Sequence, residues 1–276
     1  MASRKEQKEQ ARAARVAQEQ AAADKAQRTR RMQIFGGVIA IAAIAIVVVI
    51  VISSSNSTTP TGAHPGIQQG HTKTELVNKV ETLLHGIDQS GTTLGNPHAK
   101  VTMEYFGDLE CPICQEFTLN IFPQFIADQV RPGHVKVVYR SMCTATCDGK
   151  RSLTLQQQQF NSQQTAAYAA GMQNRFWQYT ELFYHQQQTE GTGYADDSFL
   201  TGLANQIPGF DVSKWQTDRK DPSLLDTVNA DQAYAQKAGL PGTPSLIMKG
   251  PRGEELVNNG NFPSYSDLAS AVNSVS

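Results

Sequence analysis

The sequence predicts an α/β domain in which a block of helices is inserted between two groups of strands. Segments 101–109 and 135–142 are rich in β-branched and aromatic residues, and the segment 112–130 between them has a helical spacing of apolar residues. This order is a βαβ unit, whose two strands we expect to be parallel and joined by a right-handed crossover. Helical patterns then fill about 150–239, before strand patterns return.

The other elements follow from local patterns. Residues 74–85 have the spacing of an amphipathic helix, and the turn-rich segment 86–100 has room for a short first strand. Three helices of the inserted block each begin after an Asp suited to N-capping. A glutamine run at 156–159 is interpreted as a solvated helix face. We expect a long helical stretch over 153–187, helices from 196, 211 and 221, strands at 244–250 and 254–260, and a helix at 263–275.

The first 72 residues predict an anchor and a tether. Residues 1–33 form a basic tail, and residues 34–52 carry no charged or strongly polar side chain over the length that a helix needs to cross a bilayer. A cleaved signal peptide is the alternative, but it would need a shorter apolar region and a small-residue cleavage site. Residues 53–72 are rich in Ser, Thr, Gly and Pro, which is typical of a flexible linker. The domain itself is expected at 73–276.

Charges beside the apolar segment predict its orientation. Arg28, Arg30 and Arg31 precede it, whereas no lysine or arginine follows it until Lys73. Because positive charge favours the cytoplasmic side of a span, we expect a single-pass signal-anchor with a cytoplasmic N-terminus. Residues 53–276 would then lie outside the cytoplasm.

The composition excludes several classes of function. The 276 residues carry a formal net charge of −1, and the mean hydropathy is −0.38, so charge alone does not favour a polyanionic partner. The six histidines have no metal-ligand spacing, and no phosphate loop is present in the sequence. We therefore expect no cofactor, no metal and no nucleic-acid partner.

Cys111 and Cys114 form a C-x-x-C motif where the strand 101–109 meets the next helix. At a helix N-terminus, unpaired amides and the helix dipole favour a thiolate, which is the form that attacks disulfides. Cys114 lies one turn further along, within disulfide reach. We predict a redox pair with Cys111 as the attacking nucleophile and Cys114 as the resolving, more buried thiol. A C-x-x-C beside a βαβ pattern is typical of thioredoxin-like redox proteins.

Two other interpretations of this motif stay open. It could be a structural disulfide, or it could be half of a zinc site, which would need two more ligands, for example Cys143 and Cys147. The junction of strand and helix argues against both, because a structural bridge gains nothing from a helix N-terminus.

Pro244 is the first residue of the strand-like segment 244–250, and Thr243 directly precedes it. Proline cannot donate to a sheet ladder, so it fits at the start of a strand or at an edge. If the Thr243–Pro244 bond were cis, Thr243 would offer its backbone to an incoming extended peptide. Taken alone, this motif is explained better by an ordinary trans proline in a turn.

Together, these segments resemble the DsbA-like thioredoxin-fold oxidoreductases, including the membrane-tethered BdbD type. The resemblance implies a thioredoxin fold with an inserted helical domain, and a cis-proline at Pro244 that faces Cys111 and Cys114. It also implies disulfide exchange with unfolded or folding secreted proteins that carry thiols, and recycling by a membrane redox partner of the quinone-linked oxidase type. The matching stretches are 86–117, 135–142, 176–187 and 239–248.

The resemblance also assigns a role to Glu104, because the family often carries an acid in this strand that helps to move protons at the buried cysteine. An edge-exposed glutamate is the alternative. Ile113 departs from the family pattern, since it replaces the histidine of the best-known DsbA. Asp108 and Glu110 place negative charge near Cys111, which would moderate the oxidising power of the pair.

Cys143 and Cys147 lie outside the family's core motif. Free thiols tend to oxidise outside the cytoplasm, so we expect these two residues to form a second disulfide. It would be a structural staple at the entry to the helical insertion, or a second redox relay to Cys111 and Cys114. A relay requires the two pairs to approach within exchange distance.

The predicted activity is that of a thiol–disulfide oxidoreductase that introduces disulfides into exported proteins. One alternative is the same fold working as a reductase or isomerase, which the reduction potential would separate from an oxidase. Another is a tethered thioredoxin-fold module that binds without catalysis.

Overall fold

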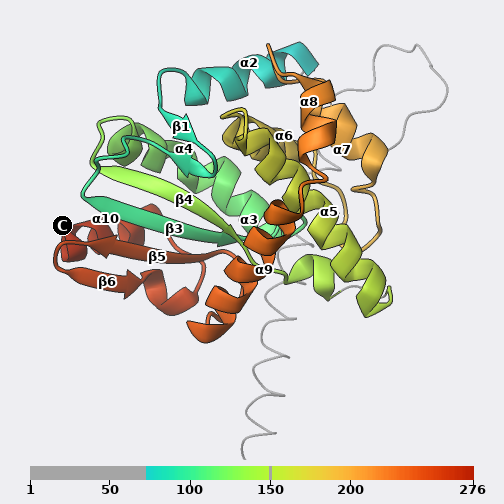
Figure 1. Cartoon of the computed structure of the whole chain (residues 1–276). Coiled ribbons are helices and arrows are strands. Elements are labelled where there is room, and N and C mark those ends of the chain that lie inside the picture. The colour runs from blue at the N-terminus through green and yellow to red at the C-terminus, as the bar shows by residue number, and fades with distance from the viewer. Residues whose placement is uncertain (1–72, 149–150) are drawn as a thin grey trace, which may run out of the picture. The chain divides into compact units, whose positions relative to one another are not determined.

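The computed structural model describes residues 73–148 and 151–276, which include a six-stranded mixed sheet with helices packed around it (Figure 1). The strand order is β1-β2-β4-β3-β5-β6. β3 and β4 are parallel, which confirms the predicted βαβ unit, and the other neighbouring pairs are antiparallel. The strands are β1 (Gln89–Ser90), β2 (Thr93–Leu94), β3 (Val101–Gly107), β4 (Val135–Ser141), β5 (Ser245–Gly250) and β6 (Gly253–Leu256).

β3 has a different environment on each of its faces. Met103 and Tyr105 belong to the main core, whereas Phe106 packs in a second cluster with Ala235 and Ile247. Side chains alternate between the two faces of a strand, so Glu104 lies on the same side as Phe106. This alternation decides what Glu104 can reach.

The crossover from β3 to β4 is less regular than the single helix predicted for 112–130. Pro123 lies in its middle, where a proline removes one backbone hydrogen bond and crowds the preceding turn. Phe117 and Phe125 are buried as the predicted apolar spacing requires, but Ile113 is 45% exposed. The crossover consists of α3 (Pro112–Glu116), a π-helical turn η1 (Phe117–Ile121), α4 (Phe122–Phe125) and a second π-helical turn η2 (Ile126–Val130).

The inserted block is helical, and α5 to α8 gather on the right in Figure 1. The three predicted caps are confirmed, because Asp196, Asp211 and Asp221 each accept a hydrogen bond from a backbone N–H of the helix that follows. The helical stretch predicted over 153–187 is confirmed, but it consists of two helices separated by a turn near Asn174, whose φ is 56°. The helices are α5 (Leu153–Gly171), α6 (Phe176–His185), α7 (Asp197–Ala204), α8 (Val212–Asp218) and α9 (Pro222–Lys237).

The glutamine run does not form a wholly solvated helix face. Gln156 is only 2% exposed, and Gln159 donates to the carboxylate of Glu110 next to the C-x-x-C motif. The helix α5 therefore presents amides toward the site, which the composition of the run alone did not indicate.

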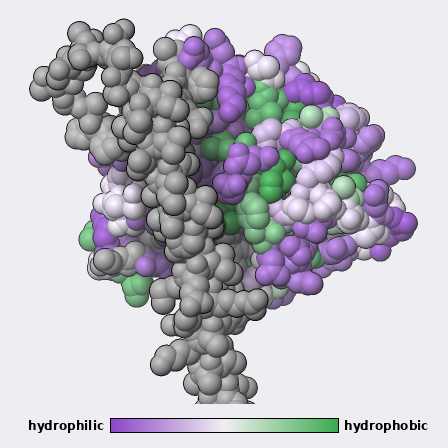
Figure 2. All heavy atoms as spheres, turned by 180° about the vertical axis from the view of Figure 1, so that it is seen from behind, coloured by the Kyte–Doolittle hydropathy of each residue, from purple (hydrophilic) through white to green (hydrophobic). Residues whose placement is uncertain are grey.

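The remaining elements complete the two ends of the domain. A capping box at Ser264 and Asp267 starts the last helix. Seen from the side opposite to Figure 1, apolar side chains gather near the middle of the surface with hydrophilic ones around them (Figure 2). These elements are α2 (Lys73–Leu84), the short 3-10 turns η3 (Ala145–Cys147) and η4 (Val257–Gly260), and α10 (Tyr265–Val275).

The basic tail, the apolar segment 34–52 and the linker lie outside the described residues. Within residues 73–148 and 151–276, no helix combines the length and the apolar character needed to cross a membrane.

Candidate active site

Cys111 occupies the N-cap position of α3, directly after the turn that leaves β3. Its backbone is extended, with φ −70° and ψ 119°, and its N–H donates to the carbonyl of Asp108 at 3.1 Å. Its carbonyl accepts from the N–H of Gln115 at 3.1 Å, which begins the helix. The sequence places Cys111 here because Pro112 is well suited to the first helical position.

The second part of the site comes from the turn before β5. The Thr243–Pro244 bond is cis, as the resemblance implied. The Cys111 sulfur lies 3.5 Å from the carbonyl oxygen of Thr243, so residues 132 apart in sequence meet at the thiol. The antiparallel pairing of β5 with β3 brings these two turns together.

The two cysteines are free thiols with opposite environments. A hydrogen bond with Cys114 lowers the pKa of Cys111 to about 7; burial opposes this shift, and the contact with Thr243 supports it. Burial raises the pKa of Cys114 well above its usual value, and Cys111 adds to that shift. Cys111 is therefore the cysteine that forms a thiolate near neutral pH, whereas the fully buried Cys114 stays protonated.

Asp108 and Glu110 are buried acids that directly precede this motif in the sequence. Burial raises the pKa of both carboxyl groups, and hydrogen bonds partly offset that effect. Glu110 accepts from Gln159, Gln163 and the N–H of Gly191, at 2.5, 2.6 and 2.8 Å. Uncharged donors therefore hold the carboxylate of Glu110, the residue that directly precedes Cys111 in the sequence.

A group of hydroxyls behind Cys114 was not predicted from the sequence. The hydroxyl of Tyr105 lies 3.1 Å from that of Thr118 and donates to that of Tyr184 at 3.4 Å. Tyr184 in turn donates to the carbonyl of Asp108 at 3.3 Å. Strand alternation puts Tyr105 on the opposite face of β3 from Glu104, but the sequence does not show which face meets α3.

The predicted proton-transfer role of Glu104 is not supported by its position. Its carboxylate pairs with Arg140 at 2.7 Å and with Lys249 at 2.8 Å, and it accepts from the Tyr234 hydroxyl at 2.9 Å. Burial alone would raise the pKa of Glu104, but these three hydrogen bonds outweigh it and lower the pKa. Since Glu104 shares the Phe106 face of β3, the structure does not bring it to the cysteines.

Cys143 and Cys147 are joined in a disulfide with a Cα–Cα distance of 5.8 Å, which confirms the predicted pairing. The bridge closes a short loop between β4 and α5. Within the described part of the chain, no hydrogen bond links either of its sulfurs to Cys111 or Cys114.

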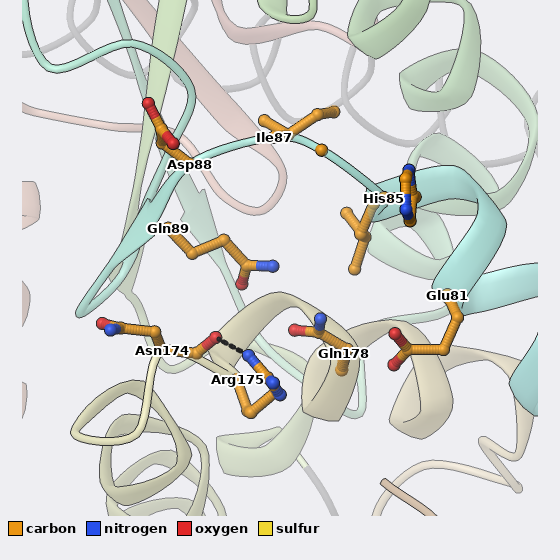
Figure 3. Close-up of a pocket in the computed structure, with 10 residues that line it drawn as sticks. Glu81, His85, Ile87, Asp88, Gln89, Asn174, Arg175 and Gln178 are labelled. Atoms are coloured by element: carbon orange, nitrogen blue, oxygen red, sulfur yellow. Dashed lines mark hydrogen bonds between the residues drawn. The ribbon is translucent and has the colours of Figure 1, made fainter. Parts of the chain in front are cut away.

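A surface pocket of about 320 Å³ lies apart from these groups, between the end of α2, β1 and the start of α6 (Figure 3). Glu81 and Gln178 reach it from different helices, and Arg175 donates to the carbonyl of Asn174 at its edge. None of its lining residues belongs to the predicted site. Among residues 73–148 and 151–276, no three His, Cys, Asp or Glu side chains are arranged to hold a metal ion.

Known proteins share this fold. A protein of Bacillus anthracis called probable disulfide bond formation protein D is 21% identical over 181 residues, which cover 65% of this chain and 76% of that protein. The crystal structure of oxidised BdbD from Bacillus subtilis matches at a TM-score of 0.55 and 20% identity, over 66% of this chain and 91% of that one. Pseudomonas aeruginosa DsbA2 matches at a TM-score of 0.53 and 18% identity, over 69% of this chain and 97% of that one.

The mixed sheet with inserted helices is also the fold of these DsbA-like proteins. Together with the sequence relatives, it supports a thiol–disulfide oxidoreductase of the DsbA-like class. The model of the family described as Thioredoxin matches residues 88–265. This chain therefore belongs to the thioredoxin family.

Proposed function

We propose that the chain donates disulfides to exported proteins through Cys111 and Cys114. The observation that carries this proposal is the meeting of Cys111 with the cis Thr243–Pro244 turn, while the pKa of Cys111 is about 7. A thiol with that pKa leaves readily as a thiolate at neutral pH, which is what the second step of disulfide donation requires of Cys111.

Disulfide donation takes two exchange steps. A substrate thiolate attacks the Cys111 sulfur of the oxidised pair; the Cys111–Cys114 bond breaks, and the Cys114 sulfur takes the electron pair and then a proton. The second thiolate of the substrate attacks the substrate sulfur of the mixed disulfide, which releases Cys111 as a thiolate. The substrate has then lost two electrons and the pair has gained them.

The burial of the two cysteines suits these roles. Cys111 is 5% exposed at the end of its turn, and Ile113 beside it is open to solvent. Cys114 is fully buried, so a substrate meets Cys111 first. The Thr243 backbone stands beside the attacked sulfur, where an extended peptide could lie along it.

An isomerase or reductase is the second candidate function, in which electrons flow in a different direction. Ile113 offers no charge to favour the Cys111 thiolate, and Asp108 opposes that thiolate electrostatically. Both features lower oxidising power, which favours an isomerase or reductase. We place oxidation first because the relatives include proteins named for disulfide bond formation.

The compartment and the partners form part of the same proposal. The apolar segment 34–52 would anchor the chain with residues 53–276 outside the cytoplasm. Unfolded or folding secreted proteins would be the substrates. A membrane redox partner of the quinone-linked oxidase type would take two electrons from the reduced pair and return it to the disulfide.

Trapping tests whether Cys111 is the attacking residue. In Cys114→Ala, Cys111 keeps its thiol but has no resolving partner. We expect the full chain with this change to capture a one-cysteine peptide that is supplied as its glutathione mixed disulfide. The product is a covalent complex that dithiothreitol releases, measured by mass spectrometry.

The matched control is the double variant Cys111→Ala, Cys114→Ala, which should capture no peptide. Equal capture by both variants, or no capture by either, would contradict the assigned role of Cys111.

A further inference from the structure

The loop closed by the Cys143–Cys147 disulfide lies against the candidate active site without taking part in the proposed exchange steps. It follows β4 directly and contains η3. Strands β3 and β4 are parallel neighbours, so the loop leaves the sheet at the same end as the turn that carries Cys111. Two of its residues, Thr144 and Thr146, reach that site.

One set of contacts joins the loop to Asp108, three residues before Cys111. The N–H groups of Thr144 and Thr146 donate to one carboxylate oxygen of Asp108, at 2.8 and 3.0 Å. The hydroxyl of Thr146 lies 2.5 Å from the other oxygen, which also accepts from the N–H of Glu110 at 3.1 Å. Backbone donors on both oxygens favour the ionised carboxylate.

A second contact joins the loop to the cis-proline turn. The hydroxyl of Thr144 lies 2.5 Å from that of Thr243, whose carbonyl meets the Cys111 sulfur. The loop therefore touches the site on both sides of the nucleophile. Neither contact involves the sulfurs of the bridge themselves.

Within the described part of the chain, no ion pair neutralises this carboxylate. Among the described residues, no lysine or arginine forms an ion pair with Asp108 or Glu110. Glu110 and Glu190 are the other acids whose charges interact with that of Asp108. The charge of Asp108 opposes the thiolate of Cys111, so whatever keeps Asp108 ionised restrains that thiolate.

We propose that the disulfide-closed loop Cys143–Cys147 is a clamp that positions Asp108 and Thr243 against Cys111, and that opening its bridge makes the Cys111–Cys114 pair a stronger oxidant. This inference rests on the proposed function. Two molecules of a low-molecular-weight thiol open the bridge, leaving two thiols on the loop and forming one disulfide between themselves. No electrons pass between the two cysteine pairs.

The direction of the effect follows from the loss of donors. When the bridge opens, the loop is no longer held in a tight turn and its three hydrogen bonds to Asp108 weaken. The buried carboxylate then either takes up a proton or meets water, and both outcomes reduce its opposition to the Cys111 thiolate. A more stable thiolate stabilises the reduced pair, which raises its oxidising power.

The test is the equilibrium of the full chain with glutathione redox buffers, with alkylation and peptide mass spectrometry to follow each cysteine pair separately. The variants are Cys143→Ser with Cys147→Ser, and Thr146→Val, which removes a single donor to Asp108. Thr180→Val is the matched control, because Thr180 is as buried as Thr146 but donates only to Trp177 in α6.

We expect the double serine variant to shift the Cys111–Cys114 equilibrium toward the reduced pair about tenfold, which is about 30 mV. Thr146→Val should shift it in the same direction by less, and Thr180→Val should not shift it. Equal constants for the wild type, the double serine variant and Thr146→Val would overturn the clamp. If the double serine variant does not fold, an unshifted Thr146→Val overturns it alone.

Two further outcomes distinguish a failure of the clamp from a failure of the proposed function. A mixed disulfide between Cys111 and Cys143 or Cys147 in the wild type would show a relay and overturn the clamp. A Cys111–Cys114 pair that cannot be titrated in the wild type would overturn the proposed function, and the clamp with it, since the clamp rests on that function.

Discussion

Replacement of Cys111 by alanine is expected to lower the rate of disulfide exchange at least about 1000-fold, because the sulfur that forms the mixed disulfide is removed. Cys114 cannot take its place, since a single thiol, fully buried and with a raised pKa, has no partner for the disulfide that is donated. The measurement is the rate at which the oxidised full chain converts a two-cysteine peptide to its disulfide.

Ile113→Ala is the matched control, because Ile113 is exposed beside Cys111 and makes no hydrogen bond through its side chain. It should change the rate by less than about tenfold, which is about 1.4 kcal/mol of barrier. Unchanged exchange, or full biological activity, in Cys111→Ala would favour the binding module without catalysis over both enzyme interpretations.

Replacement of Glu104 by alanine is expected to lower the free energy of unfolding by about 2 kcal/mol, because Lys249 loses its buried partner and Arg140 keeps only Asp231, at 2.9 Å. Glu104 is 5% exposed, whereas the side chains of Arg140 and Lys249 keep about a third of their surface. Exchange by the folded variant should persist, since the carboxylate lies on the other face of β3. Urea unfolding at pH 7 measures the first effect and peptide oxidation the second.

Glu254→Ala is the control for this substitution. Glu254 also pairs with Lys249, but at 3.8 Å and with its side chain 71% exposed, so we expect a loss below about 1 kcal/mol. A large loss of disulfide exchange in folded Glu104→Ala would contradict this account and support a role of Glu104 in proton transfer.

The pH dependence of the Glu104 effect has a defined sign. Hydrogen bonds from Lys249, Arg140 and Tyr234 outweigh burial and hold the pKa of Glu104 below its ordinary value of 4.5. Its stabilisation is therefore fully present above that value and is lost as the pH falls through the lowered pKa. The difference between the wild type and Glu104→Ala should shrink accordingly in acid.

The sequence allowed those parts of the site to be predicted that depend on local chemistry. The strand at 101–109, the helix start at Pro112 and the spacing of Cys111 from Cys114 are readable from neighbouring residues. The cis bond at Pro244 came from the resemblance, because Thr-Pro before a strand fits a trans turn as well.

The predictions were wrong where tertiary contacts, rather than neighbouring residues, determine the surroundings of a side chain. Glu104 and Tyr105 are adjacent in β3, and a shift of one residue moves a side chain to the other face of the sheet. The chain gave no local sign of which face would meet α3. The glutamine run likewise looked solvated, because its composition does not show that Glu110 lies within reach of Gln159.

The contacts of Thr144 and Thr146 could not be predicted either. A four-residue spacing between Cys143 and Cys147 indicated a bridge, but the approach of their loop to Asp108 depends on the parallel register of β3 and β4. Position in the sheet, rather than residue type, places this loop beside the nucleophile.

The reduction potential of Cys111 and Cys114 in the full chain tests the central claim most directly. Titration in glutathione buffers, read by alkylation of the two cysteines, should show a two-electron couple near about −120 to −180 mV, the range of dedicated oxidants and isomerases. A value near about −270 mV would show a thioredoxin-like reductant and contradict disulfide donation. A pair that no glutathione buffer titrates would contradict catalysis altogether.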